Sequence, residues 1–398
     1  MRRLVDLDDS LDPSRLDPRI VGDKAARLAR ARELGLPVPP GRVVPMREAE
    51  RALRWGVAAL GRGGSGAARL AVMDEVLDPG LAEHLRAALA ELGTPVVARS
   101  SSALEAGGRW AGAFSSFRDL GPGDVAVAVR GCWASAFSVD ALGRAGAMGV
   151  PVERIGMAVL IQPQVHAVAG GTATLAPDGA VTVETVRGSP AALVGGWQRG
   201  DRTVVGPDGS VAPAGGGLAV LEPPGPSPSP VREVAEVLRR LHAGTGDDLI
   251  EWALTEGGVV LLQARRADVT RAAGELVLPR AQERAVRGTA AAPGIGAGHA
   301  MVVLNPHAPG TRPEGSGYVV VAANPLPALA PLLWRASALV TASGGPGAHL
   351  VDVARSLRVP AVVSAPIEDL IGPLAGGEPR SHVLVVDGGT GLVSAVRV

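Results

Sequence analysis

Short segments of strand length, separated by helical patterns and by turns rich in Gly or Pro, recur along this chain of 398 residues. Examples are 95–99, 157–162, 249–254, 259–264 and 318–322. These apolar runs match buried strands and fall far short of the roughly 20 residues that a membrane-spanning helix requires. The alternation therefore predicts a mixed α/β protein whose strands are buried in sheets.

The chain is too long for one ordinary core of about 100 to 200 residues, so two domains are expected. Residues 267–287 are rich in Ala, Arg and Glu without a sustained pattern, and from Gly288 onward the strands and helices become shorter. We therefore predict a larger domain at 1–266, a linker at 267–287 and a compact α/β domain at 288–398.

The charge balance is even, with 39 basic and 39 acidic residues. Such a balance favours neither a nucleic acid nor a membrane surface as a partner. The first ten residues turn acidic at once and lack the apolar region of a signal peptide. The sequence thus predicts a cytoplasmic protein.

Cys132 is the only cysteine, which excludes an internal disulfide and a cysteine-based metal cluster. Residues 131–137 around it have the composition of a helix face that packs against a core. We expect a buried, structural thiol.

Lys24 is the only lysine, since every other basic residue is Arg. The heavy use of Ala, Gly and Arg indicates a GC-rich coding sequence in which Lys drifts to Arg wherever any cation suffices. The position that keeps Lys then calls for a compact ammonium. Lys24 lies in the first turn of a helix expected at 20–36, which favours a phosphate ligand, with a solvated helix residue as the alternative.

Arg99 stands where the strand 95–99 is expected to end, immediately before the three serines at 100–102. A cationic side chain at such an end is well placed to bind a ligand beside a sheet.

The segments 249–254 and 259–264 are joined by Thr-Glu-Gly-Gly, which predicts a β-hairpin. Glu251 lies on one strand, and Gln263 and Arg265 lie on or beside the other. Polar groups therefore converge within otherwise apolar strands, which indicates a site.

His349 follows a Gly-rich turn, 341–348, between an expected strand and an expected helix. The glycines allow a ligand to approach the backbone, and the free N–H groups and dipole of a helix start favour an anion. Imidazole is a nucleophile that is largely neutral near pH 7. These features favour phosphate chemistry at His349, while a capping or packing histidine remains the alternative.

The surroundings of His349 resemble the phosphohistidine domain of the phosphoenolpyruvate synthase and pyruvate phosphate dikinase family. That family has two glycines, two variable residues, Ser or Thr, the histidine, an Ala-rich helix through Val-Ala-Arg, and an Ile-Pro-Ala-Val strand. The positions that match are Gly344, Gly345, His349, Ala354, Arg355, Pro360 and Ala361. Residues 288–294 resemble the opening of the same domain, and 386–391 resemble its closing hairpin.

The first two thirds of the chain resemble the ATP-grasp-like nucleotide domain of that family. The matching segments, in order, are 22–28, 35–41, 97–101 with Glu105, 132–135, Gln162 with Val165, Glu184, 250–253 and 262–265. The resemblance implies an α/β (α+β) chain with an ATP-grasp-like nucleotide-binding region followed by a small swivelling phosphohistidine domain.

The resemblance also implies roles for the polar residues. Lys24 and Arg99 would hold the triphosphate of ATP, and Glu251 and Gln263 would hold Mg²⁺ and the phosphates. Arg265, together with Arg99, would neutralise charge that develops during transfer.

Glu105 and Glu184 match less specific patterns of the family. Each would be either a nucleotide-binding residue or a surface carboxylate.

The implied chemistry passes through His349. The histidine would attack the β-phosphate of ATP and release AMP, the pyrophosphoryl group would lose its outer phosphate, and the phosphohistidine would donate to an acceptor. Because one histidine must then visit two places, the linker at 267–287 would supply the movement.

Four residues depart from the family pattern. Ala348 stands where the family has Ser or Thr, Pro346 removes a backbone donor, Leu249 stands where an Asp precedes the glutamate, and Arg266 replaces a Pro. Slower chemistry, a different acceptor or lost activity would each follow from such changes. Since the charged residues and His349 remain, a working enzyme is the favoured interpretation.

The two predicted domains occupy the length of this chain and leave no room for the large pyruvate or rifampin domain of other family members. An unidentified small-molecule acceptor would then bind between the domains, or a partner protein would supply the acceptor site. Two alternatives stay open, a self-phosphorylating subunit of a multi-protein phosphotransferase and a nucleotide-binding pseudoenzyme.

Overall fold

The computed structural model describes residues 3–8, 13–106, 110, 112–198, 200–213, 229–266, 284–305, 317–372 and 382–397. The chain divides into two compact units. The first comprises Met1–Val183, Arg187–Ser189 and Arg202–Ala267, and the second comprises Glu184–Val186, Pro190–Asp201 and Asp268–Val398. Of the expected linker, residues 267–283 lie outside the described residues, whereas Arg284–Arg287 form strand β12.

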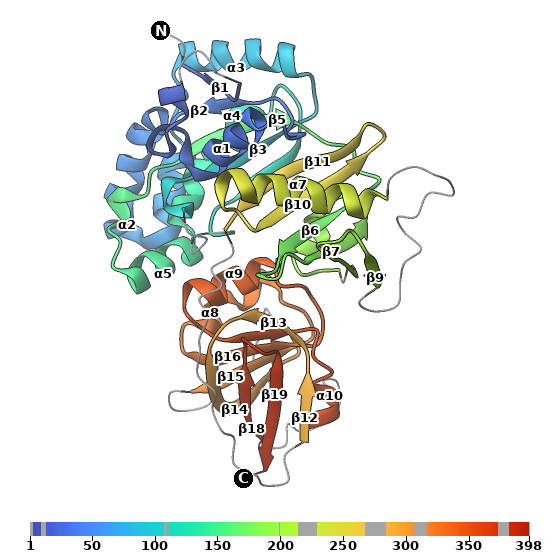
Figure 1. Cartoon of the computed structure of the whole chain (residues 1–398). Coiled ribbons are helices and arrows are strands. Elements are labelled where there is room, and N and C mark those ends of the chain that lie inside the picture. The colour runs from blue at the N-terminus through green and yellow to red at the C-terminus, as the bar shows by residue number, and fades with distance from the viewer. Residues whose placement is uncertain are drawn as a thin grey trace. The chain divides into compact units, whose positions relative to one another are not determined.

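One sheet of the first unit has five strands in the order β1-β2-β5-β3-β4, all antiparallel to their neighbours (Figure 1). Its strands are β1 (Val5–Asp6), β2 (Arg42–Val44), β3 (Val96–Ser101), β4 (Ser116–Leu120) and β5 (Ala158–Pro163). Strand β3 continues two residues beyond Arg99. The expectation that Arg99 ends its strand was therefore wrong, because Ser100 and Ser101 continue the pairing with β5.

Five helices belong to this part of the first unit: α1 (Pro18–Glu33), α2 (Met46–Met73), α3 (Pro79–Leu92), α4 (Val125–Ala134) and α5 (Val139–Met148). Residues 61–66, Gly-Arg-Gly-Gly-Ser-Gly, have the composition of a polar loop, yet α2 runs through them. Only Gly63 and Gly64 leave helical geometry there.

A second sheet has six strands in the order β11-β10-β6-β7-β8-β9. Its strands are β6 (Ala169–Leu175), β7 (Val181–Arg187), β8 (Asp201–Val205), β9 (Val211–Pro213), β10 (Leu249–Thr255) and β11 (Gly258–Arg265). Helix α7 (Pro230–Thr245) packs against β6, β10 and β11 (Figure 1). The hairpin expected at 249–264 is thereby confirmed as an antiparallel pair.

Two apolar cores support the first unit. Trp133 and Phe137 lie in the core beside the five-stranded sheet, with Cys132 fully buried among them. Trp252, Leu238 and other residues of α7 and the hairpin form the other core. Because Ile250 and Trp252 face this core, strand alternation turns Glu251 to the opposite face.

Residues 125–146 are long and apolar enough to span a membrane by length and composition alone. In the structure they form α4, a 3-10 turn at Ser135–Phe137, and α5. More than half of the stretch is buried inside the protein, which is the behaviour of core helices.

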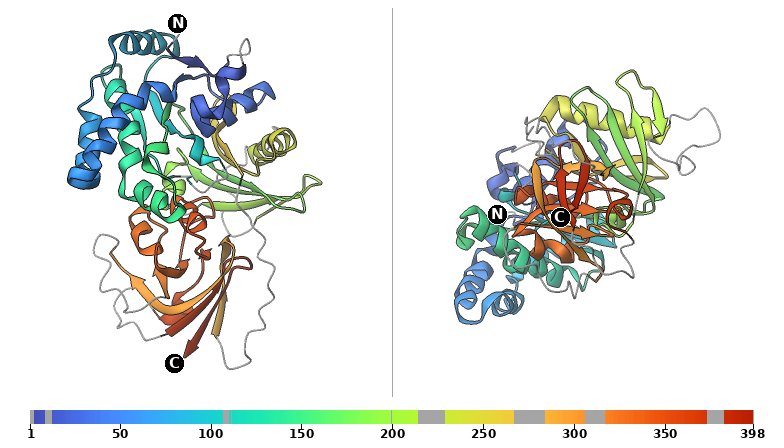
Figure 2. Two further views of the ribbon diagram at one scale, coloured as in Figure 1. Left: turned by 90° about the vertical axis from the view of Figure 1, so that its left-hand side faces the viewer. Right: turned by 90° about the horizontal axis from the view of Figure 1, so that it is seen from below.

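The second unit is built on an eight-stranded sheet in the order β12-β19-β18-β14-β15-β16-β17-β13. Its strands are the orange and red arrows of Figure 2. Strands β14 (Ile295–Val303), β15 (Tyr318–Ala322), β16 (Ala336–Thr341) and β17 (Ala361–Val363) are parallel. The others are β12, β13 (Thr289–Ala292), β18 (His382–Asp387) and β19 (Leu392–Arg397).

Helices α8 (Ala330–Leu333), α9 (His349–Ser356) and α10 (Glu368–Ile371) accompany the strands of this sheet along the chain, and the short helix α6 (Ala191–Val194) also belongs to the second unit. Helix α9 lies in the connection between the parallel strands β16 and β17, so His349 follows the C-terminal end of β16. Ligands of open α/β sheets bind at that kind of edge.

Candidate functional site

Lys24 is buried in the first unit, with only 8% of its side chain exposed. Its Nζ donates a hydrogen bond to the carbonyl of Ser100 at 2.7 Å and lies 3.4 Å from Oε1 of Glu105. The alternative of a solvated helix residue is therefore wrong. The compact ammonium of Lys and the planar guanidinium of Arg differ in shape, so they are not interchangeable in this enclosed space.

The backbone next to Lys24 is anchored to the serines after Arg99. Asp23 N–H donates to the carbonyl of Ser102 at 3.1 Å, and Ala25 N–H donates to Oγ of Ser101 at 3.1 Å. Gly22 interrupts α1 with φ of 78°, and a Cβ there would lie 2.3 Å from atoms of Ser101. Only glycine combines this φ with this approach, so Gly22 lets the helix start press against β3.

Glu105 is only 7% exposed, so it is not a surface carboxylate. It closes a capping box on the short 3-10 helix Ala103–Glu105, in which its Oε2 accepts from Ser102 N–H at 2.9 Å. Its other oxygen faces Lys24. Glu105 therefore holds the Lys24 ammonium in place through a carboxylate that is itself fixed.

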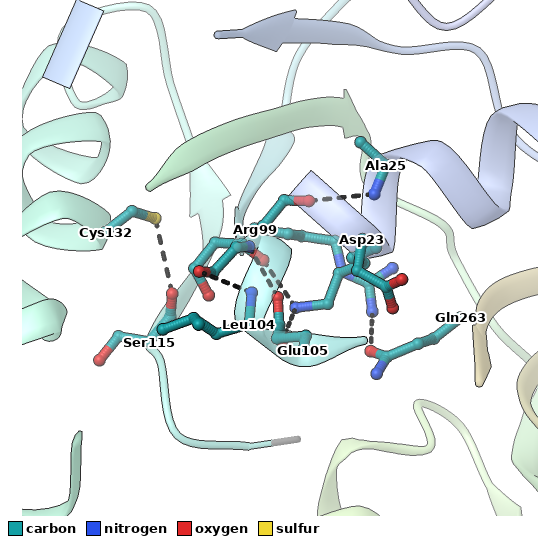
Figure 3. Close-up of polar contacts among 12 residues, drawn as sticks. Asp23, Ala25, Arg99, Leu104, Glu105, Ser115, Cys132 and Gln263 are labelled. Carbon is teal, nitrogen blue, oxygen red and sulfur yellow. Dashed lines mark hydrogen bonds and ion pairs between the residues drawn. The ribbon is translucent and has the colours of Figure 1, made fainter. Parts of the chain in front are cut away.

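Arg99 connects the two sheets of the first unit (Figure 3). Its guanidinium donates to the carbonyl of Leu262 and, at 3.1 Å, to Oε1 of Gln263, and it lies 3.9 Å from Oε2 of Glu251. Burial lowers the pKa of Arg99, while the nearby charges of Glu251 and Glu105 oppose that shift. An arginine remains charged under such conditions because its ordinary pKa is so high.

The hairpin places its acceptors on one face. Glu251 pairs directly with Gln263 across β10 and β11, and the next pair is Trp252 with Leu261, so Leu262 is the extra residue of a β-bulge. A bulged residue leaves the regular ladder. This irregularity turns the Leu262 carbonyl toward Arg99, which accounts for the contact between the sheets.

The structure thus joins five of the predicted residues into what we call the Lys24–Arg99 cluster: Lys24, Arg99, Glu105, Glu251 and Gln263. Arg265, 6% exposed, lies two positions beyond Gln263 on β11 and pairs with Leu249. Glu184, 5% exposed, lies on β7, which β6 separates from β10 in the order of the sheet.

A hollow of about 880 Å³ opens beside the hairpin in the first unit. Its lining includes Pro39, Val165, His166 and Val260. The hollow shares no residue with the cluster, yet Val260 pairs with Ala253 and so faces the same side of the hairpin as Glu251 and Gln263. Its size falls within the usual range of small-molecule sites, about 300 to 1,000 Å³.

Among the described residues, no group of three or more His, Cys, Asp or Glu side chains is arranged to hold a metal ion. Mg²⁺ does not require such a cage, because it keeps water ligands and binds through one or two carboxylates plus substrate phosphates. The carboxylate of Glu251 and the amide oxygen of Gln263, paired on adjacent strands, are oxygen donors of that kind.

His349 begins α9 in the second unit, as expected, and its side chain is 39% exposed. Its Nδ1 is buried, which leaves Nε2 as the ring nitrogen able to meet a substrate. The helix start lacks a side-chain cap because its N-cap residue is Ala348.

Sequence reasoning missed two groups of the site, one beside Arg99 and one beside His349. The Leu262 carbonyl could not be foreseen, since a bulge leaves no clear mark in the sequence. Asp352 lies three positions after His349, with its Oδ2 3.9 Å from Nδ1. The signal for Asp352 was available, because residues three apart on a helix face each other.

Comparison with known families finds two matches. Residues 18–212 match the pyruvate phosphate dikinase AMP/ATP-binding domain, and residues 314–391 match the mobile domain of PEP-utilising enzymes. The first match includes Lys24, Arg99, Glu105 and Glu184, and the second includes His349.

Three curated relatives share the printed name phosphoenolpyruvate synthase, in two cases as "Probable". That of Methanothermobacter thermautotrophicus is 26% identical over 71% of this chain and 44% of its own length. That of Staphylothermus marinus is 25% identical over 87% of this chain and 53% of its own length. That of Aeropyrum pernix is 28% identical over 94% of this chain and 56% of its own length.

The chain therefore spans about half the length of the curated relatives that it matches. A solved D-alanyl-alanine synthetase A of Vibrio cholerae covers 62% of this chain and 55% of its own, at 12% identity and a TM-score of 0.31, a likeness too slight to carry an argument. The two domain matches in order and the shared relatives establish that the chain belongs to the phosphoenolpyruvate synthase and pyruvate phosphate dikinase family.

Proposed function

We propose that this chain is an ATP-dependent phosphotransferase of the dikinase type, in which His349 carries the phosphate. The observation that supports this most is the Lys24–Arg99 cluster, where buried cations are fixed beside the carboxylate and amide of the hairpin. With Arg265 the set holds three cations and two carboxylates, so it favours an anion such as a triphosphate.

We place the nucleotide along the face of the hairpin that carries Glu251, Gln263 and Val260. The base occupies the hollow at Val260 and Val165, whose lining is largely apolar. Ala253, the partner of Val260, lies two residues from Glu251, a rise of about 7 Å along the strand. The triphosphate then extends from the hollow toward Lys24, Arg99 and Arg265.

Glu251 and Gln263 would hold Mg²⁺ together with the phosphates. The ion supplies charge neutralisation on the phosphoryl oxygens when it is bound. Arg99 already contacts both side chains, so it is positioned to keep them oriented and to donate to a phosphate from the same location.

The reaction at His349 forms a bond from Nε2 to the β-phosphorus of ATP and breaks the bond between that phosphorus and the oxygen of AMP. Water then takes the outer phosphoryl group as inorganic phosphate. The remaining phosphohistidine transfers its phosphoryl group to an acceptor. Arg99 and Arg265 stabilise charge that develops on the bridging oxygens in the first step.

The acceptor in this proposal is a small molecule, taken up by this chain or presented by a partner protein. ATP in the cytoplasm is the phosphate source. Acceptor-dependent AMP formation, measured with the purified chain and panels of 2-oxo acids and alcohols, would identify its class.

Labelling with ATP that carries ³²P at the β-position tests the central step. The wild type and the control His84→Ala, which changes an exposed residue of α3, should become labelled and release AMP. His349→Ala should remain unlabelled and release no AMP. Equal labelling of His349→Ala and the wild type would overturn the proposed role of His349.

A further inference from the structure

Asp352 is buried at the first turn of α9, with 2% of its side chain exposed, and its two carboxylate oxygens face different partners. Oδ1 accepts a hydrogen bond from Arg355 at 3.0 Å. Oδ2 lies 3.9 Å from Nδ1 of His349. The carboxylate thus stands between a permanent cation and the edge of the imidazole that faces inward.

Arg355 holds this carboxylate by being fixed itself. Its Nε donates to the carbonyl of Ala291 on β13 at 2.9 Å, and another nitrogen donates to the carbonyl of Pro346 at 2.7 Å. The same arginine therefore secures the loop before His349, a strand of the sheet and Asp352. The ion pair also offsets the cost of burying the Asp352 charge.

Nδ1 of His349 is buried and has no hydrogen-bond acceptor within range among the described residues. Elements that pack against α9 include α8, β13, β17 and the 3-10 helix Pro327–Leu329. These carry no titratable side chain. Asp352 is accordingly the anionic group that α9 and these elements present to Nδ1.

We propose that Asp352 is the positioning residue of His349, and that it fixes the proton on Nδ1 so that Nε2 keeps its lone pair for attack on phosphorus. A movement of about 1 Å would bring Nδ1 within hydrogen-bond distance of Oδ2. The terminal torsion of a histidine is broad enough to allow it. This inference rests on the proposed function of His349.

The assignment also accounts for Ala348. Ala348, the residue before His349, has no hydroxyl with which to orient the ring. The carboxylate of Asp352 supplies an acceptor three residues further along the same helix. A carboxylate in contact with one imidazole nitrogen determines which tautomer the ring adopts.

The substitution Asp352→Asn in the full chain tests this directly. An amide can present its oxygen to Arg355 or to His349, but not to both, and Arg355 offers only donors. The amide NH₂ then faces Nδ1 and favours the tautomer with the proton on Nε2. We expect the labelling rate to fall between about 10-fold and about 10⁴-fold, as when the partner of a reacting imidazole is altered.

The decisive readout is the tautomer of His349, measured by long-range ¹H–¹⁵N correlation at an alkaline pH where the ring is neutral. The His349→Ala spectrum identifies the signals. The wild type should carry its proton on Nδ1, and Asp352→Asn should carry it on Nε2. Asp369→Asn, a change of an exposed carboxylate on α10, should alter neither the tautomer nor the labelling rate.

Asp352→Glu retains a carboxylate and should keep the wild-type tautomer with a smaller loss of rate, which preserves the test if the asparagine variant is unstable. The same tautomer in all variants would overturn the proposal, and a fall in thermal stability and rate without a tautomer change would assign Asp352 a purely structural role. Absence of labelling in the wild type would instead refute the proposed function, while the tautomer would still report on Asp352.

Discussion

The Lys24–Arg99 cluster encloses its charged side chains, whereas the start of α9 leaves the side chain of His349 partly exposed. In the cluster, Lys24 is enclosed by Ser100 and Glu105, and Arg99 contacts Gln263 and the Leu262 carbonyl. At the start of α9, the side chain of His349 is 39% exposed and its Nδ1 is buried. One region is fixed by contacts between distant segments, and the other depends on a single helical turn.

This difference indicates that nucleotide binding and phosphate transfer depend on different regions of the chain. A site made of pre-paired charges gains affinity because its groups need not reorganise around the ligand. A nucleophile must be accessible to its substrate. The protein can therefore orient the imidazole only through the ring nitrogen that does not react. Nucleotide binding should then depend on the cluster alone, and phosphate transfer should depend on both regions.

Among changes at the cluster, Lys24→Ala should have the largest effect. It removes a cation from the phosphates and leaves the buried carboxylate of Glu105 without its ammonium. We expect AMP formation to fall on the order of 10²- to 10³-fold, the loss typical of a preorganised electrostatic group. Calorimetric titration with Mg–ATP should show binding weakened in parallel.

Two further variants serve as comparisons for Lys24→Ala. Lys24→Arg should rescue poorly, because a planar guanidinium does not fit the space of an ammonium between Ser100 and Glu105. His349→Ala should abolish AMP formation and leave Mg–ATP affinity unchanged. Loss of nucleotide binding in His349→Ala would contradict the separation of the two regions.

Gly22→Ala should have the next largest effect on the cluster, and Gly93→Ala is its matched control. Both glycines have almost the same backbone, with φ and ψ of 78° and 163° at Gly22 and 76° and 175° at Gly93. A Cβ at Gly93 meets nothing within 4 Å, whereas one at Gly22 would collide with Ser101.

The backbone cost of order 1–3 kcal/mol should therefore appear in both variants. Gly22→Ala should add about 1–3 kcal/mol for overpacking and weaken Mg–ATP binding, because the helix start that carries Lys24 is displaced. Urea unfolding and ATP titration of both variants provide the comparison. Equal losses in the two variants would show that the contact with Ser101 is unimportant.

The sequence predicted the cluster where local periodicity carries the information. Glu251 and Gln263 stood out as polar residues within an otherwise apolar hairpin, and Lys24 stood out as the only lysine. Arg99 was singled out as the end of a strand, but that strand continues to Ser101. Pattern reading does not fix strand ends, because neighbouring strands decide how far pairing extends.

Other features depended on contacts that no local pattern encodes. Glu105 meets Lys24 across 81 residues of sequence, and the bulge at Leu262 exists because of how β10 and β11 pair. Asp352 is different, since its spacing from His349 was visible. It was missed because the acidic residue stands in a segment that resembled an Ala-rich helix.

Cys132 offers a smaller, pH-dependent test confined to the first unit. Burial raises the pKa of its thiol from 9.0 to about 12. Below pH 9 the thiol is protonated in both folded and unfolded states, and between pH 9 and about 12 only the unfolded state loses the proton. The contribution to stability is therefore full below pH 9 and is lost as pH rises toward 12.

Urea unfolding between pH 8 and pH 10.5, a window of about 2.5 units chosen around the ordinary thiol pKa, measures this loss. Cys132→Ala should show a shallower alkaline decline than the wild type. The chain has a single Lys and a single Tyr, so few other groups titrate in the same range. Identical alkaline slopes for the two proteins would contradict a buried, protonated thiol.

Ala348→Ser should have the smallest effect and the opposite sign. Ala348 is the N-cap of α9, and no side chain satisfies the first N–H groups of that helix. A serine hydroxyl there should stabilise the helix by about 1 kcal/mol, which thermal unfolding of the second unit would detect. Since the same hydroxyl lies beside His349, it should also restore part of the labelling rate when combined with Asp352→Asn. Stabilisation without that recovery would show that the hydroxyl caps the helix and leaves the ring unoriented, so that Asp352 alone connects helix α9 to the chemistry.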